Sequence, residues 1–173
     1  PKLVLIGNFG AHNIGDELIL AGCLKKLKKE LPKAKITVLG NDPKLIQNFH
    51  KVKSLPLLPC GIRSFLQNNW RKSLREIREA DLIIFPGGGL FTDEESIHAI
   101  FIWGLHILVA RYFWKPVYLL GQSIGEIKNK YAKKITSKIL QKTEFIGVRD
   151  QASIKELKKM GISTSKIKLG KDT

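Results

Sequence analysis

The sequence predicts an α/β domain in which helices cover both faces of a parallel sheet. Short apolar runs alternate with longer segments of helical periodicity along the chain. The apolar runs contain few polar residues, as is typical of strands that are buried on both faces. A strand, helix, strand order that repeats in this way favours a doubly wound, mostly parallel sheet with right-handed crossovers.

The elements can be placed in order along the chain. We expect strands at 3–6, 36–39, 52–57, 82–85, 117–120, 145–148 and 167–169. We expect helices between them at 15–30, 43–49, 62–80, 95–113, 128–142 and 150–160. Pro86 is expected to end the fourth strand. Ligands of such Rossmann-like folds bind outside the carboxyl ends of the strands, so the loops that follow the strands are the candidate site.

Composition limits the classes of function. The 173 residues are 43% hydrophobic and carry a net charge of +15, so they can form one domain with a full core. The charge favours anionic partners, with lysine-rich solvent-facing helices as the alternative explanation. Nucleic acid is not expected as a partner, because no RNA-binding aromatic signature lies among the lysines.

The cysteines and the apolar segments bear on location. Cys23 and Cys60 have neither metal-ligand spacing nor a disulfide framework, and we expect no metal. The chain enters its first expected strand within a few residues, so we expect no signal peptide and a cytoplasmic location. Residues 97–113 are nearly long enough to span a bilayer but include His106 and Arg111. We expect a packed helix there, with contact to a membrane surface or a second domain as the alternative.

The first candidate loop, GNFGAHNIGDE, has the glycine spacing of a phosphate-binding P-loop. Gly10 and Gly15 fit that spacing, but Asp16 and Glu17 stand where the motif requires Lys and then Ser or Thr. A nucleotide P-loop is therefore excluded. Dinucleotide binding stays open, because Asp42 lies after the second strand, about where a ribose-binding acid would be.

The same loop is nevertheless expected to face a ligand. Its glycines, Gly10 and Gly15, allow close approach of the backbone, and the helix that follows offers free N–H groups at its start. Asp16 is the candidate functional acid, with complementation of the helix dipole as the structural alternative. His12 and Asn13 are expected on the ligand side of the loop.

The second candidate loop is FPGGGLFTDEES. Gly87, Gly88 and Gly89 leave backbone N–H groups exposed without side chains in the way, which suits an anionic or sugar ligand. Thr92 and Asp93 are interpreted as caps of the next helix.

The third candidate loop, GQSIGE, contains Gln122 and Ser123 after the fifth strand. Its G-x-S-x-G spacing matches a hydrolase nucleophile elbow, which needs a histidine later in the chain. All four histidines precede Ser123, so the hydrolase order cannot be completed within this chain.

The sixth strand is followed by GVRDQAS. Arg149 stands at the strand exit, where a guanidinium can clamp phosphate or carboxylate in a bidentate manner. Pairing of this arginine with a neighbouring acid is the alternative. Asp150 is placed to cap the next helix.

Together, these stretches resemble the polysaccharide pyruvyl transferase family. Its pattern is seen in the ordered set GAHNIGDE, FPGGGLFTD, GQSIG and VRDQAS, and the resemblance runs from Lys2 to the end of the chain. Ser123 is a departure, because the family usually has a third glycine there.

The resemblance implies an architecture and an activity. This chain would be the N-terminal half of a two-domain, glycosyltransferase-B-like enzyme and would end near the inter-domain crossing at Asp172. Such enzymes transfer pyruvate from phosphoenolpyruvate, without a cofactor, as a ketal onto a sugar of a cell-surface polysaccharide or its precursor. By resemblance, Asp16 and Arg149 are the active-site residues, and the isolated half is expected to be inactive.

Two other classes of function stay open. One is half of a nucleotide-sugar-dependent glycosyltransferase on the same architecture. The other is a non-catalytic Rossmann-like binding module. The expected partners are phosphoenolpyruvate, a sugar or polysaccharide acceptor and a C-terminal second domain. Peripheral contact with a lipid-linked glycan at the inner membrane face is a further alternative.

Overall fold

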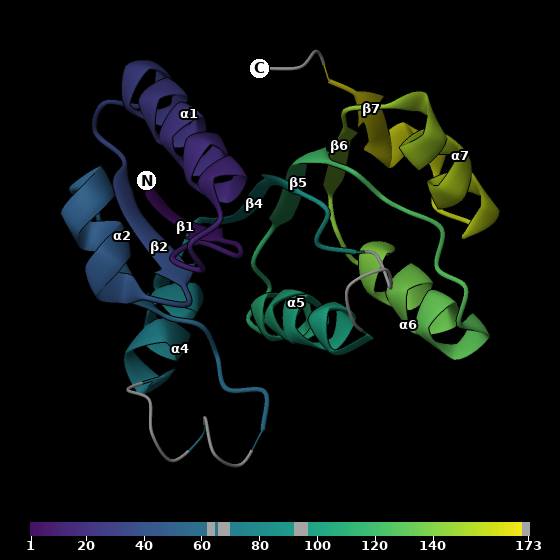
Figure 1. Ribbon diagram of the computed structural model, residues 1–173, viewed down its shortest axis with the longest axis horizontal. Coiled ribbons are helices and arrows are strands. Elements are labelled where there is room, and N and C mark those ends of the chain that lie inside the picture. Colours follow the sequence, from purple (N-terminus) through teal and green to yellow (C-terminus); the bar gives the residue numbers. More distant parts are fainter. Residues whose placement is uncertain (62–64, 66–69, 92–96, 171–173) are drawn as a thin grey trace.

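The computed structural model describes residues 1–61, 65, 70–91 and 97–170 (Figure 1). The strands are β1 Lys2–Ile6, β2 Lys35–Gly40, β3 Lys53–Pro56, β4 Leu82–Gly88, β5 Val117–Gln122, β6 Phe145–Val148 and β7 Ile167–Leu169. The helices are α1 Ile14–Glu30, α2 Pro43–His50, α4 Trp70–Glu79, α5 Ile97–Tyr112, α6 Lys130–Leu140 and α7 Gln151–Lys159, with a short 3₁₀ helix, Thr164–Lys166, before β7.

The seven strands form one sheet in the order β3-β2-β1-β4-β5-β6-β7, and every neighbouring pair is parallel. The expected doubly wound parallel sheet is therefore confirmed. The chain builds outward from β1 in one direction through β2 and β3, and in the other from β4 to β7. The strand order reverses between β1 and β4, and a ligand crevice forms at such a point in this class of fold.

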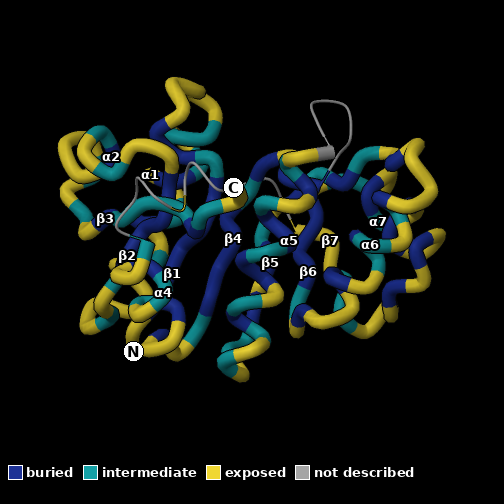
Figure 2. Tube along the Cα trace, turned by 90° about the horizontal axis from the view of Figure 1, so that it is seen from below, coloured by how far each residue is buried: buried dark blue, intermediate teal, exposed yellow. Residues whose placement is uncertain are grey.

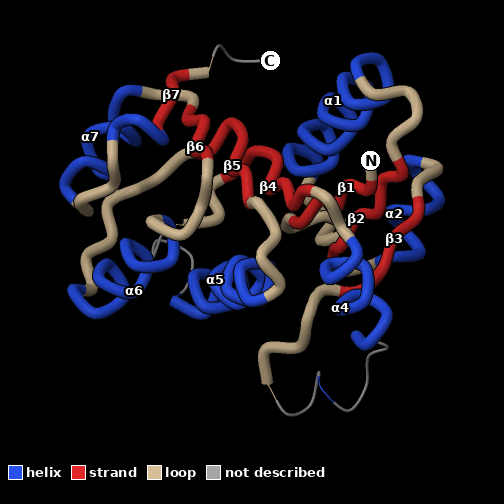
Figure 3. Tube along the Cα trace, turned by 180° about the vertical axis from the view of Figure 1, so that it is seen from behind, coloured by secondary structure: helices blue, strands red, loops and turns tan. Residues whose placement is uncertain are grey.

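Two hydrophobic clusters hold the helices to opposite faces of the sheet. On one face, Leu20 and Leu24 of α1 pack with Leu3 and Leu5 of β1. The other face packs against α4, α5 and α6, which lie together on that side of the sheet (Figure 3). Neighbouring residues of β1 alternate between the two clusters, because successive side chains of a strand point to opposite faces. The central strands β1 and β4 are deeply buried (Figure 2), whereas β7 at the edge of the sheet is largely exposed.

The strands that lead to the site are longer than expected. The prediction that Pro86 ends the fourth strand is wrong, because β4 continues to Gly88. Pro86 pairs with Leu120, and Gly88 pairs with Gln122 at the end of β5. Gly87 and Gly88 thus belong to the strand end rather than to the following loop. Of the helix expected at 62–80, α4 is seen from Trp70, and residues 62–64 and 66–69 lie outside the described part.

Helix α5 contains a buried histidine. The side chain of His106 has no exposed surface, and its Nε2 accepts a hydrogen bond from the Leu58 N–H at 2.9 Å. Its Nδ1 therefore carries the proton and donates to the Ile102 carbonyl at 2.8 Å. Burial lowers the pKa of His106 to about 4, so the ring is neutral at pH 7. Within the described part of the chain, no helix combines the length and the apolar character needed to cross a membrane.

Candidate active site

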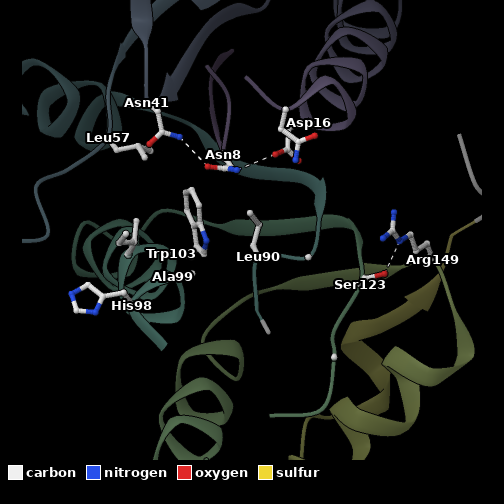
Figure 4. A pocket seen from close by; sticks show the side chains of 14 residues that line it. Asn8, Asp16, Asn41, Leu57, Leu90, His98, Ala99, Trp103, Ser123 and Arg149 are labelled. Atoms are coloured by element: carbon white, nitrogen blue, oxygen red, sulfur yellow. Dashed lines mark hydrogen bonds between the residues drawn. The ribbon is translucent and has the colours of Figure 1, made fainter. Parts of the chain in front are cut away.

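A cleft of about 500 Å³ opens at the carboxyl ends of the central strands (Figure 4). It lies where the strand order reverses between β1 and β4 and also receives residues that follow β2, β5 and β6. Its lining combines polar side chains from these loops with apolar side chains of α5. The lining residues are Asn8, Asn13, Asp16, Asn41, Leu57, Gly89, Leu90, His98, Ala99, Ile102, Trp103, Ser123, Gly125 and Arg149.

Asp16 lies in the first turn of α1 and is held by a chain of side-chain amides. Asn8 donates from Nδ2 to Asp16 Oδ2 at 3.1 Å, and Asn41 donates from Nδ2 to Asn8 Oδ1 at 3.0 Å. Figure 4 shows these three side chains in line above the cleft. Asn13 is the N-cap of α1 and accepts from the Gly15 N–H at 3.0 Å, so the helix begins at Ile14, two residues before Asp16. The carboxylate is therefore placed by residues from two strand exits.

Gly10 allows the loop after β1 to pack against the loop after β2. Its φ is +73°, and a Cβ at this position would lie 2.7 Å from the Asp42 backbone nitrogen. Its N–H donates to Glu17 Oε1 at 2.7 Å, and the other oxygen of Glu17 lies 2.6 Å from His50 Nε2. Gly10 thus shapes the loop and does not line the cleft. Asp42, the possible ribose ligand, uses Oδ1 to cap α2.

Three other residues of the first loop were predicted to contact a ligand: His12, Asn13 and Gly15. His12 is exposed in the left-handed region, at φ +59°, and does not line the cleft. Gly15 is an exposed residue in the first turn of α1. Of the expected ligand-side pair His12 and Asn13, only Asn13 lines the cleft.

The end of β4 passes close to Asp16. A Cβ on Gly88 would lie 3.6 Å from Asp16 Oδ1, and a Cβ on Gly87 would lie 2.5 Å from Ile19 of α1. Both glycines have positive φ, at +55° for Gly87 and +94° for Gly88. Together they bring the strand end against α1 and the acid, while Gly89 lines the cleft. The predicted helix caps Thr92 and Asp93 lie outside the described residues.

Gln122 is buried at the end of β5 and does not line the cleft. Its Nε2 donates to the Phe85 carbonyl at 3.0 Å and to the Gly87 carbonyl at 3.1 Å. Its Oε1 has no hydrogen-bond partner among the described residues. The side chain therefore stabilises the end of β4. It influences the site indirectly, by holding the backbone of Gly87.

Arg149 reaches the cleft from the end of β6 and is held by Ser123. Its Nε donates to Ser123 Oγ at 2.6 Å, and that hydroxyl donates to Asp150 Oδ2 at 3.1 Å. Asp150 also caps α7, as expected, by accepting from the Ser153 N–H at 2.7 Å. The pKa of Asp150 is lowered by that backbone hydrogen bond first, and also by Ser153, by Ser123 and by the charge of Arg149. Arg149 lines the cleft, and its two terminal nitrogens take no part in the bond to Ser123 (Figure 4).

Five predicted residues thus come together in one cleft: Asn13, Asp16, Gly89, Ser123 and Arg149. Asn8 and Asn41 were not among the predicted site residues, although both lie just beyond strand ends, where ligands of parallel sheets bind. His98 and Trp103 were not predicted either, because the apolar sequence of their helix indicates a core element. Among the described residues, no group of three or more His, Cys, Asp or Glu side chains is arranged to hold a metal ion.

The family assignment agrees with the motifs that meet in this cleft. The sequence profile described as polysaccharide pyruvyl transferase matches residues 13–173. The chain belongs to this family. Its matched region contains Asp16, Ser123 and Arg149 and excludes only the first strand and part of the loop that follows it.

One curated relative of this chain is the amylovoran biosynthesis protein AmsJ from Erwinia amylovora. It is 25% identical over 207 residues, which include 99% of this chain and 48% of AmsJ. The chain therefore spans about half the length of the curated relative that it matches.

Solved structures share the fold at low sequence identity. HepE from Anabaena, in complex with UDP-glucose, aligns with a TM-score of 0.65 at 15% identity over 98% of this chain and 43% of HepE. The lipopolysaccharide outer core galactosyltransferase WaaB gives 0.61 at 14% identity, over 98% of this chain and 45% of WaaB. A UDP-N-acetylglucosamine 2-epimerase gives 0.62 at 13%, over 97% and 47%. These likenesses show the fold alone, which is that of one half of a glycosyltransferase-B-like protein.

Proposed function

We propose that this chain is the acceptor-side half of an enzyme that transfers pyruvate from phosphoenolpyruvate onto a sugar of a cell-surface polysaccharide or its precursor. One observation supports this most strongly: a carboxylate from the start of α1 and a guanidinium from the end of β6 line the same cleft. A carboxylate can accept a proton from a sugar hydroxyl, and a guanidinium can bind the carboxylate or phosphate of the donor.

One proton is transferred in each of the two steps of the reaction. A sugar hydroxyl adds to C2 of phosphoenolpyruvate, its proton is removed, and the methylene carbon receives a proton to become a methyl group. A second hydroxyl of the same sugar then forms the other C–O bond at C2 and loses its proton, while the C2–O bond to phosphate breaks. The products are the ketal and inorganic phosphate, which carries away the second proton. No cofactor is required.

Asp16 is proposed to hold the acceptor hydroxyls and to accept a proton from one of them. The amide chain from Asn41 through Asn8 fixes one carboxylate oxygen, Oδ2, by a 3.1 Å bond. The other oxygen, Oδ1, lies on the side of Gly88, 3.6 Å from where a Cβ on that residue would be, so the glycine keeps the backbone close to the acid.

Arg149 is proposed to bind the donor's carboxylate or phosphate. The Ser123 hydroxyl fixes its Nε at 2.6 Å, so less side-chain freedom is lost when a substrate binds. The other donor contacts are proposed to come from a C-terminal second domain, because the chain spans about half of its relative AmsJ. The 173-residue chain alone is accordingly proposed to be inactive, and the complete enzyme is proposed to work in the cytoplasm.

Direct measurement of the two products tests the proposal. The complete enzyme is incubated with phosphoenolpyruvate and candidate acceptor glycans; phosphate release is followed by a coupled assay and the ketal methyl group by NMR. Equal amounts of phosphate and ketal are expected. Phosphate release without a ketal, or neither product with any acceptor, would contradict the assignment.

A nucleotide-sugar-dependent glycosyl transfer is the second candidate. It is favoured by the fold shared with HepE, whose solved structure holds UDP-glucose. Thermal-shift titration of the complete protein separates the two: stabilisation by phosphoenolpyruvate and not by UDP-sugars supports pyruvyl transfer. The reverse result supports glycosyl transfer. A protein that neither ligand stabilises would fit a non-catalytic binding module.

A further inference from the structure

Helix α5 exposes an uncharged apolar face. Phe101, Leu105, Leu108 and Tyr112 follow one another at intervals of four, three and four residues, which places them on one side of the helix. Phe101 is 43%, Leu108 is 41% and Tyr112 is 79% exposed. A surface helix ordinarily carries charged or polar residues on this side.

A further exposed aromatic residue stands two residues beyond the end of α5. Trp114 is 86% exposed and is held at φ +58°, a conformation that a bulky residue rarely adopts. The single charged residue of α5, Arg111, forms an ion pair with Glu144. Two exposed aromatic side chains, those of Tyr112 and Trp114, thus lie at the C-terminal end of α5. Tyrosine and tryptophan are the residues that accumulate where hydrocarbon meets water.

The two helices beside α5 are basic on their exposed sides. They lie to either side of α5 on the same face of the sheet (Figures 1 and 3). In α4, Arg71, Arg75 and Arg78 are spaced to share one face, and all three line a groove of about 500 Å³. The groove also contains Phe113, directly after α5, and Glu79, which forms an ion pair with Arg75 and leaves the arginines in excess. In α6, Lys134 and Lys138 are exposed one turn apart. Helices α4, α5 and α6 hold nine basic and two acidic residues in total.

We propose that the outer face of α4, α5 and α6 docks on a membrane surface that contains anionic lipids. The apolar and aromatic side chains of α5 would enter the interface, and the arginines and lysines on both sides would contact the headgroups. The positive charge of this face favours an anionic membrane over a second copy of the chain. Two copies of the chain would bring the same basic side chains together and repel each other, whereas an anionic bilayer is complementary to them.

The docked orientation would bring the cleft to the membrane. The N-terminal half of α5 reaches the cleft, where His98, Ile102 and Trp103 form part of the lining. A bilayer along α5 would therefore lie beside the cleft mouth, in reach of an acceptor sugar carried on a lipid. This last step rests on the proposed function, whereas the docking itself rests on the surface alone.

Vesicle co-sedimentation tests the docking without any assay of activity. The purified protein is mixed with vesicles of phosphatidylcholine alone or with about 30 mol % phosphatidylglycerol. Binding is expected only with the anionic lipid, and it should be released by about 0.5 M salt, where charges are screened within a few ångströms. Equal binding to both vesicles, or no binding to either, would overturn the proposal.

Matched variants locate the surface. Lys134→Gln with Lys138→Gln should weaken vesicle binding about tenfold, and Tyr112→Ser should weaken it several-fold. The control pair Lys25→Gln with Lys29→Gln removes the same charge with the same spacing from α1, on the other face of the sheet, and Phe49→Ser removes an exposed ring from α2. Equal losses in the control variants would overturn the assignment of the face. So would a dimer, seen by light scattering, that Tyr112→Ser dissociates.

Discussion

Arg149 donates from Nε to the hydroxyl of Ser123 at 2.6 Å, and the same hydroxyl donates to Asp150 at 3.1 Å. Ser123 follows β5, whereas Arg149 and Asp150 follow β6, so the bond joins two neighbouring strand exits. The serine stands where the family pattern has a glycine. Its hydroxyl therefore gives this chain a means of holding the arginine that a glycine would not supply.

Removal of this hydroxyl is expected to weaken donor binding. Ser123→Gly leaves Arg149 charged but no longer oriented through Nε, and the loss of one charge-assisted bond at an exposed site is worth about 1 kcal/mol. We expect KM for phosphoenolpyruvate to rise about fivefold in the complete enzyme, with kcat changed less. Ser165→Gly is the control, because Ser165 is exposed at a distance from the cleft, next to β7. An unchanged KM would show that Ser123 does not position Arg149.

Replacement of the cleft acid is expected to remove turnover while the fold persists. Asp16→Asn keeps the size of the side chain and an oxygen that can accept from Asn8, but it cannot take a proton. General acid-base catalysis contributes about 10²- to 10⁴-fold, so kcat should fall by at least about 100-fold. Glu30→Gln, at the other end of α1, removes an equal charge and should leave kcat unchanged. Near-normal turnover of Asp16→Asn would exclude Asp16 as the base.

Replacement of Arg149 by alanine should lower kcat/KM for the donor more than kcat/KM for the acceptor. In Arg149→Ala the donor loses its proposed guanidinium partner, for which we expect a loss of about 10- to 100-fold in kcat/KM for phosphoenolpyruvate. Arg149→Lys should recover little, because an ammonium cannot form two parallel hydrogen bonds. Full recovery by lysine would show that charge alone is used, and an unchanged kcat/KM in both variants would refute the clamp.

Two glycines should respond to alanine in opposite directions. In Gly10→Ala the new methyl group would meet the Asp42 backbone at 2.7 Å in a left-handed conformation, so we expect a loss of at least about 2 kcal/mol in unfolding free energy. Gly22 lies within α1, where an added Cβ would meet nothing within 4 Å. Gly22→Ala should stabilise the chain by up to about 1 kcal/mol. Urea unfolding measures both, and equal effects would show that the packing of the first two loops is not as described.

His106 should make the stability of the fold depend on pH. Its pKa is about 4 in the folded chain and about 6.5 when exposed, so the unfolded chain binds more protons between these values. The free energy of unfolding should therefore be highest above pH 6.5 and should fall by about 2 kcal/mol from pH 7 to pH 5 through this group. His106→Leu should lose this part of the pH dependence, and it should be less stable at pH 7 because the Leu58 N–H loses its acceptor. His98→Gln should keep the dependence; an equal slope in all three proteins would assign it to other groups.

The alternation of apolar runs and helical segments was sufficient to predict the parallel sheet, because strands buried on both faces leave a strong local signal. The strand ends were harder to predict. Pro86 lacks an N–H and therefore predicts the end of a strand. β4 nevertheless continues to Gly88, because Gln122 on the neighbouring strand donates to two carbonyls of β4. A side chain distant in sequence thus decided where this strand ends.

The sequence by itself was enough to predict a parallel sheet, the order of strands and helices along the chain, and the motifs of the family. It was also enough to identify Asp16 and Arg149 as candidate active-site residues. These properties depend on local periodicity and on residues that follow strands. Only the tertiary structure decided which candidates share a cleft: it brought Ser123 under Arg149 and Asn8 against Asp16, and placed Gln122 and Gly10 behind the surface. The reason is physical, since hydrogen bonds between strand exits depend on the register and twist of the sheet, which no single segment of the sequence specifies.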